Sequence, residues 1–449
     1  MEVQTLARGV AMRAGAAARA LVLTLLTTGC GADDATPEAA PRPSAPPASD
    51  VVAERVTLPP PEPSLGGFFS LPLAFDGDTL LTATRDTANV THLHAFDRER
   101  PSRAIPLPPQ VEGERPYGFP HLLAVEGDLA VVSWVGRERE QLFVVQREGD
   151  ALRWGDEIPL GAALDPTTPS RLSALRLTGE WLVVGAASAS ESAGAVLVLR
   201  RTGARFGPPA HLRAPHPDPD AAFGDAIALD GDRLVVGAPR VDRLDGPPPT
   251  DARAYVYRRE SAGWQLEAEL APDEPEPGSG FGDAVAITGA HVMVGAPMVH
   301  RLDARPPYPA ESGAVGAVYL YRRSGSAYSL EAVLQPEGLG PLAFFGRELD
   351  AQAGRLVVGA PSSRTTRPPR PGWVHVYERC EDAWVPLAPI AGDPSRPGDL
   401  FGSRVALAAR WLAVGAPEAP AVGGAQPSTA GSVSLLRLTR ACGASTPTP

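Results

Sequence analysis

The sequence contains no lysine, so all 41 of its basic residues are arginines. Alanine and proline are abundant, as is typical of a GC-rich genome, so the exclusive use of arginine requires no functional explanation. Acidic residues number 52, and the formal net charge of −11 argues against a nucleic-acid partner.

The sequence also lacks the common catalytic motifs. It contains no His-Glu-x-x-His, no P-loop and no Gly-x-Ser-x-Gly. The eight histidines do not cluster at metal-ligand spacing, and His92 and His94, which alternate along one strand, are expected to face solvent. We therefore predict a protein that is not an enzyme, with no catalytic residue and no metal site.

No apolar run near the N-terminus is long enough to span a membrane. Arg8 and Arg13 precede a short apolar segment, residues 20–26, which resembles the core of a signal peptide. Residues 27–30, Thr-Thr-Gly-Cys, resemble a bacterial lipobox. We expect a lipoprotein-type signal peptide at 1–29 and lipid attachment at Cys30; secretion with ordinary cleavage is the alternative.

Residues 30–50 are rich in proline, alanine and acid, so they are predicted to form a disordered tether that carries no core. A lipid on Cys30 would then hold the following domain at the bacterial cell envelope, at the outer membrane or the cell surface. The last residues, 443–449, are predicted to be a disordered tail.

One phrase recurs between these ends: Phe-Gly, an alternating apolar run, a tight turn, and Val-Val-Gly-Ala-Pro. The clearest copies span residues 223–239, 281–297, 345–361 and 401–417. In the first copy, Asp230-Gly231 is a strong hairpin signal, and Pro239 ends the return strand because it has no N–H to donate. Gly237 is expected to allow a close backbone approach from the neighbouring unit.

Each unit continues into two further strands, so it is predicted to contain four antiparallel strands. The second strands begin at seven positions about 50 to 64 residues apart, a spacing that suits radially arranged blades. Those positions are Leu80, Ala130, Leu182, Leu234, Val292, Leu356 and Leu412. We predict an all-β, seven-bladed β-propeller over residues 51–442; an open solenoid is the alternative.

The chain ends indicate how the ring closes. The last unit ends after its third strand, residues 432–438, whereas residues 51–58 form a lone strand before the first unit. The N-terminal strand is therefore predicted to complete the last blade, which removes two exposed sheet edges.

These units resemble the FG-GAP repeat of integrin alpha-chain N-terminal propellers and many bacterial surface proteins. The resemblance covers roughly residues 51–438 and implies an extracytoplasmic propeller that binds a protein or another ligand. Family members often carry an Asp-x-Asp-x-Asp-Gly calcium loop, but here Asp76-Gly77-Asp78 and Asp230-Gly231-Asp232 are too short to provide six to eight oxygen ligands. We read them as hairpin turns and predict no cofactor; weak calcium binding by the acidic stretches 218–220 and 273–276 is the alternative.

Three cysteines are present: Cys30, Cys380 and Cys442. The last two follow the third strands of the sixth and seventh units, so a Cys380–Cys442 disulfide is possible in an oxidising compartment. Two unpaired thiols are the alternative, because equivalent positions on adjacent blades can be too far apart.

Candidate binding residues fall on one face of the propeller. Antiparallel connections place the short turns on one face and the long loops on the other, and long loops carry function more often than scaffold does. The loop candidates are Asp242, Asp245, Arg301, Asp303, Tyr308, Arg364 and Trp373. Arginine pairs such as Arg200-Arg201 and Arg258-Arg259 recur at hairpin turns and are expected to form a solvated rim.

Residues directly after each Phe-Gly should surround the channel mouth on the long-loop side: Asp225, Asp283, Arg347 and Ser403. They could hold a small ligand, or ion pairs such as Arg347 with a neighbouring acid could join them. We predict a lipid-anchored binding or scaffold protein that recognises a protein or glycan through the long-loop face. A propeller hydrolase or lyase acting at the channel mouth and a passive envelope structural protein are the alternatives.

Overall fold

The computed structural model describes the greater part of the chain after residue 50. The described ranges are 51–60, 70–85, 91–97, 100–105, 119–136, 140–148, 151–160, 171–189, 193–240, 252–302, 313–362, 370–394, 396–417 and 431–439. They belong to one compact unit, Ala45–Pro449. The predicted signal peptide, Cys30, the tether and the tail lie outside these ranges. Within them, no helix is long and apolar enough to cross a membrane.

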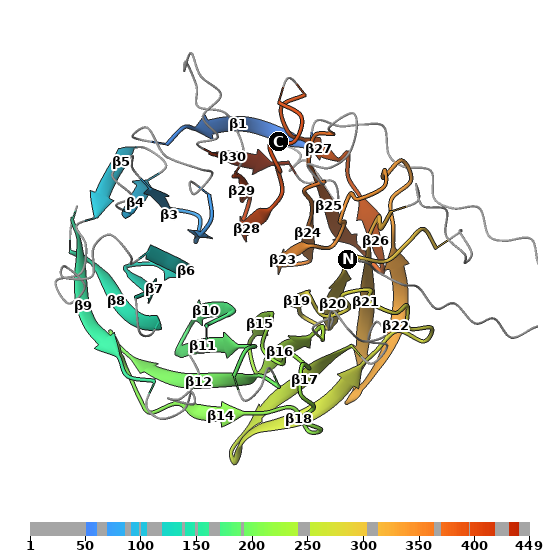
Figure 1. The fold of residues 1–449 in the computed structure, drawn as a ribbon, viewed down its shortest axis with the longest axis horizontal. Helices are drawn as coiled ribbons and strands as arrows, with labels where there is room; N and C mark the ends of the chain where they lie inside the picture. Colours follow the sequence, from blue (N-terminus) through green and yellow to red (C-terminus); the bar gives the residue numbers. More distant parts are fainter. Residues whose placement is uncertain are drawn as a thin grey trace, which may run out of the picture. The chain divides into compact units, whose positions relative to one another are not determined.

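Seven antiparallel sheets are arranged around a central channel as the blades of a propeller (Figure 1). This confirms the predicted all-β, seven-bladed fold. Blade 1 comprises β2 (Leu73–Phe75), β3 (Thr79–Arg85), β4 (Thr91–Asp97) and β5 (Arg100–Ile105). Blade 2 comprises β6 (Phe119–Glu126), β7 (Leu129–Val135), β8 (Glu140–Glu148) and β9 (Ala151–Ile158). Blade 3 comprises β10 (Ala174–Thr178), β11 (Trp181–Ala186), β12 (Ala195–Thr202), β13 (Arg205–Phe206) and β14 (Ala210–Leu212).

The remaining blades follow in chain order around the ring. Blade 4 comprises β15 (Ile227–Asp230), β16 (Arg233–Ala238), β17 (Arg253–Glu260) and β18 (Gly263–Leu270). Blade 5 comprises β19 (Ala284–Thr288), β20 (His291–Ala296), β21 (Ala317–Ser324) and β22 (Ala327–Leu334). Blade 6 comprises β23 (Glu348–Gln352), β24 (Arg355–Ala360), β25 (Trp373–Cys380), β26 (Ala383–Pro386) and β27 (Ile390–Ala391). Blade 7 comprises β28 (Arg404–Ala408), β29 (Trp411–Ala416), β30 (Ser432–Leu438) and β1 (Val52–Leu58).

The ring closes as the sequence predicted. Strand β1 pairs antiparallel with β30, with Val56 opposite Leu435 and Leu58 opposite Val433, so the N-terminal strand is the outer strand of the last blade. One blade thus combines the two ends of the domain, which covers the open edges of β30 and β1.

In blades 3 and 6 the fourth, outer strand is divided into two short segments. In blade 3 both β13 and β14 pair with β12, and in blade 6 both β26 and β27 pair with β25. Prolines lie at the interruptions, at Pro208, Pro209 and Pro389, and proline cannot donate to the ladder.

The recurrent phrase joins each blade to the next. The glycine of Gly-Ala-Pro faces the Phe-Gly of the following blade so closely that a Cβ on Gly237 would lie 2.0 Å from the Gly282 carbonyl oxygen. The phenylalanines pack inside: Phe223, Phe281 and Phe345 have no exposed surface. These findings confirm the close inter-unit approach expected at Gly237.

The apolar core lies between neighbouring blades rather than inside one sheet. In one cluster, Val183 and Val198 of blade 3 pack with Phe223, Leu234 and Tyr257 of blade 4. The Phe223 ring meets the Tyr257 ring edge-on at 6.1 Å between centroids. Because each sheet buries both of its faces against its neighbours, the inner strands are rigidly placed around the channel.

The inner hairpin turns form a second set of contacts between blades. Asp230 Oδ2 accepts the Gly289 N–H of the next blade at 2.7 Å, and Asp76 Oδ2 accepts the Gly127 N–H at 2.9 Å. Equivalent bonds join Glu126 Oε1 to the Gly179 N–H, Thr288 Oγ1 to the Gly354 N–H, and Gln352 Oε1 to the Ala409 N–H. The Asp-Gly-Asp segments are therefore hairpin turns whose first carboxylates serve as acceptors for backbone N–H groups.

The arginine pairs at the ends of the third strands are only half solvated, which corrects the expectation of a solvated rim. The Arg200 side chain is 69% exposed, but that of Arg201 is 22% exposed and lies 3.1 Å from Glu126 Oε2 of blade 2. In blade 4, the Arg259 guanidinium lies 5.3 Å from the ring centroid of Trp181 in blade 3. The second arginine of each of these pairs thus links its blade to the preceding one.

Candidate functional site

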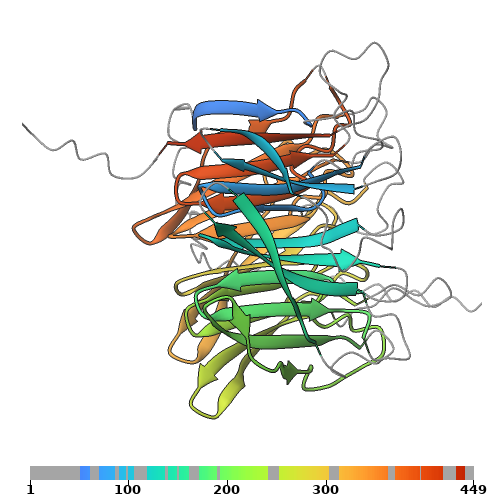
Figure 2. The same ribbon diagram turned by 90° about the vertical axis from the view of Figure 1, so that its left-hand side faces the viewer.

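The two faces of the propeller differ in the connections they carry. The first-to-second and third-to-fourth strand turns, such as those at Gly231 and Gly263, project on one face, which we call the turn face. Figure 2 shows the β17–β18 hairpin at the lower left among these turns. The segments around Phe223 and Pro239 lie at the opposite ends of the strands, on what we call the loop face.

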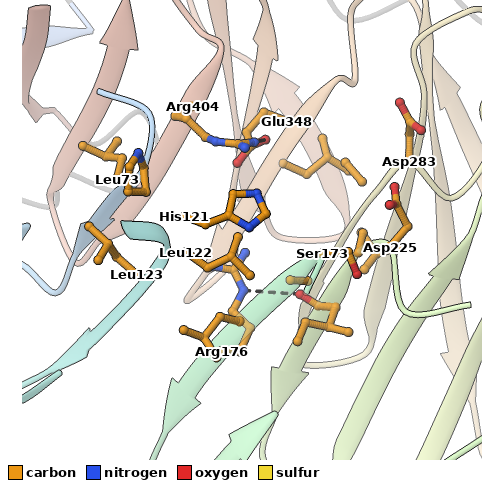
Figure 3. A pocket seen from close by; sticks show the side chains of 18 residues that line it. Leu73, His121, Leu122, Leu123, Ser173, Arg176, Asp225, Asp283, Glu348 and Arg404 are labelled. Atoms are coloured by element: carbon orange, nitrogen blue, oxygen red, sulfur yellow. Dashed lines mark hydrogen bonds and ion pairs between the residues drawn. The ribbon is translucent and has the colours of Figure 1, made fainter. Parts of the chain in front are cut away.

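The inner strands of all seven blades surround a cavity of about 150 Å³ on the channel axis. Its charged and polar lining comprises His121, Ser173, Arg176, Asp225, Asp283, Glu348 and Arg404. Figure 3 shows Glu348 beside Arg404, and Asp225 beside Asp283 on another side of the cavity. Arg404 donates from Nη1 to Glu348 Oε2 at 2.9 Å, so one acid and one base of the lining neutralise each other.

The structure brings most of the predicted mouth residues together. Arg347 donates from Nη1 to Asp283 Oδ2, which is the kind of ion pair expected between Arg347 and a neighbouring acid. Asp225 lies next to this pair on blade 4. The Ser403 hydroxyl instead donates to the Leu400 carbonyl oxygen at 2.7 Å and stabilises its own turn.

Asp225 has the most unusual environment in the cavity. Its carboxylate accepts no hydrogen bond from any described residue. Burial raises the pKa of Asp225 to about 6, the negative charge of Asp283 adds to this effect, and Arg347 and Arg404 oppose it. Burial also raises the pKa of Asp283, although its bond to Arg347 opposes the change. Asp225 is thus a carboxyl group placed to receive a proton or a hydrogen-bond donor.

Four charged channel residues were absent from the predicted site: Arg176, Glu348, Asp350 and Arg404. Asp350 accepts the Leu407 and Ala351 backbone N–H groups at 2.7 and 3.0 Å. Burial raises the pKa of Asp350, and the positive charge of Arg176 opposes the rise. Aligning the inner strands by register would have found these residues, because blades 4 and 5 carry alanine at the equivalent positions.

A serine, a glutamate and a histidine meet beside the cavity, but they are not arranged for nucleophilic catalysis. Glu140 Oε1 accepts from the Ser133 hydroxyl and lies 3.1 Å from His121 Nδ1, while its Oε2 accepts the Leu172 N–H at 2.8 Å. A catalytic triad needs the histidine between the serine and the acid. Here the acid is in the middle, and its side chain is 2% exposed, so the cluster joins blade 2 to blade 3.

The structure describes two of the remaining loop candidates, Trp373 and Arg301. Trp373 is half-buried and packs against the cluster that contains Phe345 and Leu349, while Arg301 is half-buried on the loop face. The candidates Asp242, Asp245, Asp303, Tyr308 and Arg364 lie outside the described residues. No group of three or more His, Cys, Asp or Glu side chains within the described ranges is placed to hold a metal ion.

The prediction that His92 and His94 both face solvent is wrong for His94. His94 is 1% exposed, and its Nε2 lies 2.7 Å from Thr84 Oγ1. Burial lowers the pKa of His94 to about 4, so the ring is neutral at pH 7. His94 is therefore part of the interior of blade 1 rather than of a solvent-facing pair.

Cys380 is disulfide-bonded, and its predicted partner Cys442 lies outside the described residues. Arg355 Nη2 donates both to Glu378 Oε1 at 3.2 Å and to the Thr439 carbonyl oxygen at 2.9 Å. The chain after β30 therefore begins close to the end of β25. The pairing of Cys380 with Cys442 stays a prediction.

Closed seven-bladed propellers serve many different functions. The fold and the position of the binding candidates at one channel mouth therefore do not identify the function of this chain. The comparison with known families is more specific. Residues 208–257, from the end of blade 3 through the third strand of blade 4, match the FG-GAP repeat family. This match and the seven-bladed architecture together fit an FG-GAP β-propeller. No match to a curated protein was found.

Proposed function

We propose that this chain is a lipid-anchored, extracytoplasmic binding module whose loop face recognises a protein partner. Its likeness to FG-GAP propellers supports a binding or scaffold role. Protein and glycan partners were both expected from the sequence, and the apolar side chains of the loop face favour a protein.

The distribution of exposed apolar side chains carries this proposal. The large apolar side chains that are exposed among the described residues are all aliphatic: Val56, Leu71, Leu266, Met298 and Leu302. Leu71, Met298 and Leu302 lie on the loop face. Exposed methionine and leucine side chains suit protein partners, because they adapt their shape to an apolar surface. A sugar ring would find no fully exposed aromatic side chain to stack on in the described part of this face.

A pull-down from envelope extract with mass spectrometry tests the proposal. Met298→Asp should release the specific partner, because it places a charge in the apolar contact. Leu266→Asp is the matched control, because Leu266 is 41% exposed on the outer strand β18 and Met298 is 44% exposed. The loop face is wrongly assigned if both variants retain the same partners. Capture of a glycan instead would identify the other class of ligand.

The membrane anchor is tested on the same protein. Labelling with a fatty-acid analogue should mark wild type but not Cys30→Ser, and the variant should appear in the medium. An unlabelled wild-type protein found in the medium would support secretion with ordinary cleavage instead.

A second candidate function is an enzyme at the channel mouth, because Asp225 and Asp283 are neighbouring carboxyls with raised pKa values. A carboxyl with a pKa of about 6 can act as a general acid near neutral pH. Turnover of glycan or ester substrates that Asp225→Asn abolishes would establish this function. Absence of turnover across both substrate panels would leave binding, or a passive structural role in the envelope.

A further inference from the structure

A hollow opens on the loop face beside the channel mouth, across blades 5, 6 and 7. It has a volume of about 470 Å³, which lies in the range of small-molecule sites. Its apolar walls are Pro297, Met298, Phe344, Pro361 and Leu400, and its polar edge is Arg347, Ser362 and Ser403. We call this set the blade 5–7 hollow.

Two of its walls adopt a backbone conformation that large side chains rarely take. The residue before each Phe-Gly has a positive φ: 54° at Ala222, 68° at Gly280, 54° at Phe344 and 59° at Leu400. Blade 5 places glycine at this position, and glycine suits it because it has no Cβ. Blade 4 places alanine there, and blades 6 and 7 place phenylalanine and leucine, at a cost of about 1–2 kcal/mol each. The two bulky residues of this set are those that line the hollow.

Arg347 supplies the hydrogen-bond donors of the polar edge that remain available to a ligand. The Ser362 hydroxyl already donates to the Pro371 carbonyl oxygen, and that of Ser403 to the Leu400 carbonyl oxygen. Among the described residues, the Arg347 side chain donates from Nη1 alone, to Asp283, and it is 58% exposed. A guanidinium has five N–H groups in a planar fork, so this one can hold a second carboxylate without losing the first.

We propose that the blade 5–7 hollow binds a small organic acid, with its apolar body on Met298, Phe344 and Leu400 and its carboxylate on Arg347. The hollow offers a cation and apolar walls together, and an amphipathic carboxylate complements both. This site is independent of the protein partner proposed for the loop face, because a small ligand would contact only the residues that line the hollow.

Isothermal titration calorimetry on the full-length protein tests the proposal with octanoate as the probe. Octanol is the matched neutral ligand and octylammonium the matched cation. Octanoate should bind at least about tenfold more tightly than octanol, because a hydrogen bond between charged groups contributes more to the binding free energy than a neutral hydrogen bond does. Octylammonium should bind more weakly than octanol.

Two variants separate the charge from the walls. Arg347→Gln should lower octanoate affinity about tenfold and abolish the preference over octanol. Arg200→Gln, which changes an exposed, ion-paired arginine on the turn face of blade 3, should leave both affinities unchanged. Phe344→Gly should weaken octanoate and octanol together, and a thermal melt verifies that this variant folds.

Any of the following results would overturn the proposal: no heat with octanoate up to about 10 mM, a range that detects the weakest specific binding; equal affinities for octanoate and octanol; or equal losses in Arg347→Gln and Arg200→Gln. Binding of a peptide with a C-terminal leucine but not of octanoate would assign the hollow to a protein C-terminus and would likewise overturn it.

Discussion

Replacing Gly295 with alanine should separate blade 5 from blade 6 at their closest contact. Gly295 belongs to the Gly-Ala-Pro of blade 5, and a Cβ added to it would lie 2.1 Å from the Gly346 carbonyl oxygen and 3.2 Å from the Gly346 carbonyl carbon. Real Cβ atoms stay more than 3.0 Å from such atoms, so one backbone must move by about 1 Å. Gly295 lies inside the paired strand β20, and the Gly346 N–H donates to the Gly359 carbonyl oxygen at 3.1 Å, so neither backbone can move alone.

The expected loss in the free energy of unfolding is about 3 kcal/mol. Overpacking a close-packed interior costs about 1–3 kcal/mol, and movement of Gly295 also weakens the 2.9 Å bond from the Gly282 N–H to its carbonyl, worth about 1 kcal/mol. For a domain of roughly 390 residues, unfolding entropy scales to about 0.8 kcal/mol per degree, so the melting temperature should fall by about 4 °C.

Gly289→Ala is the matched control in the same blade. Gly289 has a φ of 60°, but a Cβ there would meet nothing within 4 Å. Ala409 occupies the equivalent turn of blade 7 with a φ of 53°, so the fold accepts alanine at this position. The control should cost about 1 kcal/mol, from backbone conformation alone. Urea unfolding measures both variants; a loss in Gly295→Ala no larger than that in Gly289→Ala would refute the clash argument.

Three further predictions concern single side chains. Asp225→Asn should be more stable than wild type at pH 7, by at most about 3 kcal/mol, because the folded pKa of about 6 lies above the unfolded value of 3.8. Ionisation of Asp225 therefore lowers wild-type stability as pH rises from about 4 to 6, and urea titrations across that range should show no such fall for the variant. Asp230→Ala should lose about 1 kcal/mol in urea unfolding because it removes the acceptor for the Gly289 N–H, and Asp230→Asn should recover most of it; equal losses would contradict this. Cys442→Ser should expose the Cys380 thiol to a thiol reagent and cost about 2–4 kcal/mol, whereas release of that thiol by Cys30→Ser would disprove the pairing.

The fold was predictable because similar local signals recur along the chain, most clearly in blades 4 to 7. Alternation, Asp-Gly turns and strand-ending prolines locate the strands, and the lone N-terminal strand predicts the closure that β1 and β30 form. The exceptions are local. The outer strands of blades 3 and 6 divide near prolines, and His94 faces the interior because in blade 1 its side of the strand is the buried one. The alternation of apolar and polar residues along a strand does not by itself indicate which side of the strand faces the core.

The candidate site was only partly predictable. The position after Phe-Gly correctly places Asp225, Asp283 and Arg347 around the channel mouth. Arg176 and Asp350 were missed because their significance depends on which strand is innermost and on contacts across the ring. A sequence pattern along one blade does not contain that information.

The recurrent phrase and the candidate site are complementary for a physical reason. Residues shared by several blades, such as Gly295 and Phe281, are fully occupied by contacts between neighbouring blades, so they have nothing left to offer a ligand. Binding chemistry must therefore lie where one blade departs from the others. Arg347 stands where blades 4 and 5 have aspartate, and Phe344 stands where they have alanine and glycine. In a repeat protein of this kind, the departures from the repeat are the places to look for the ligand.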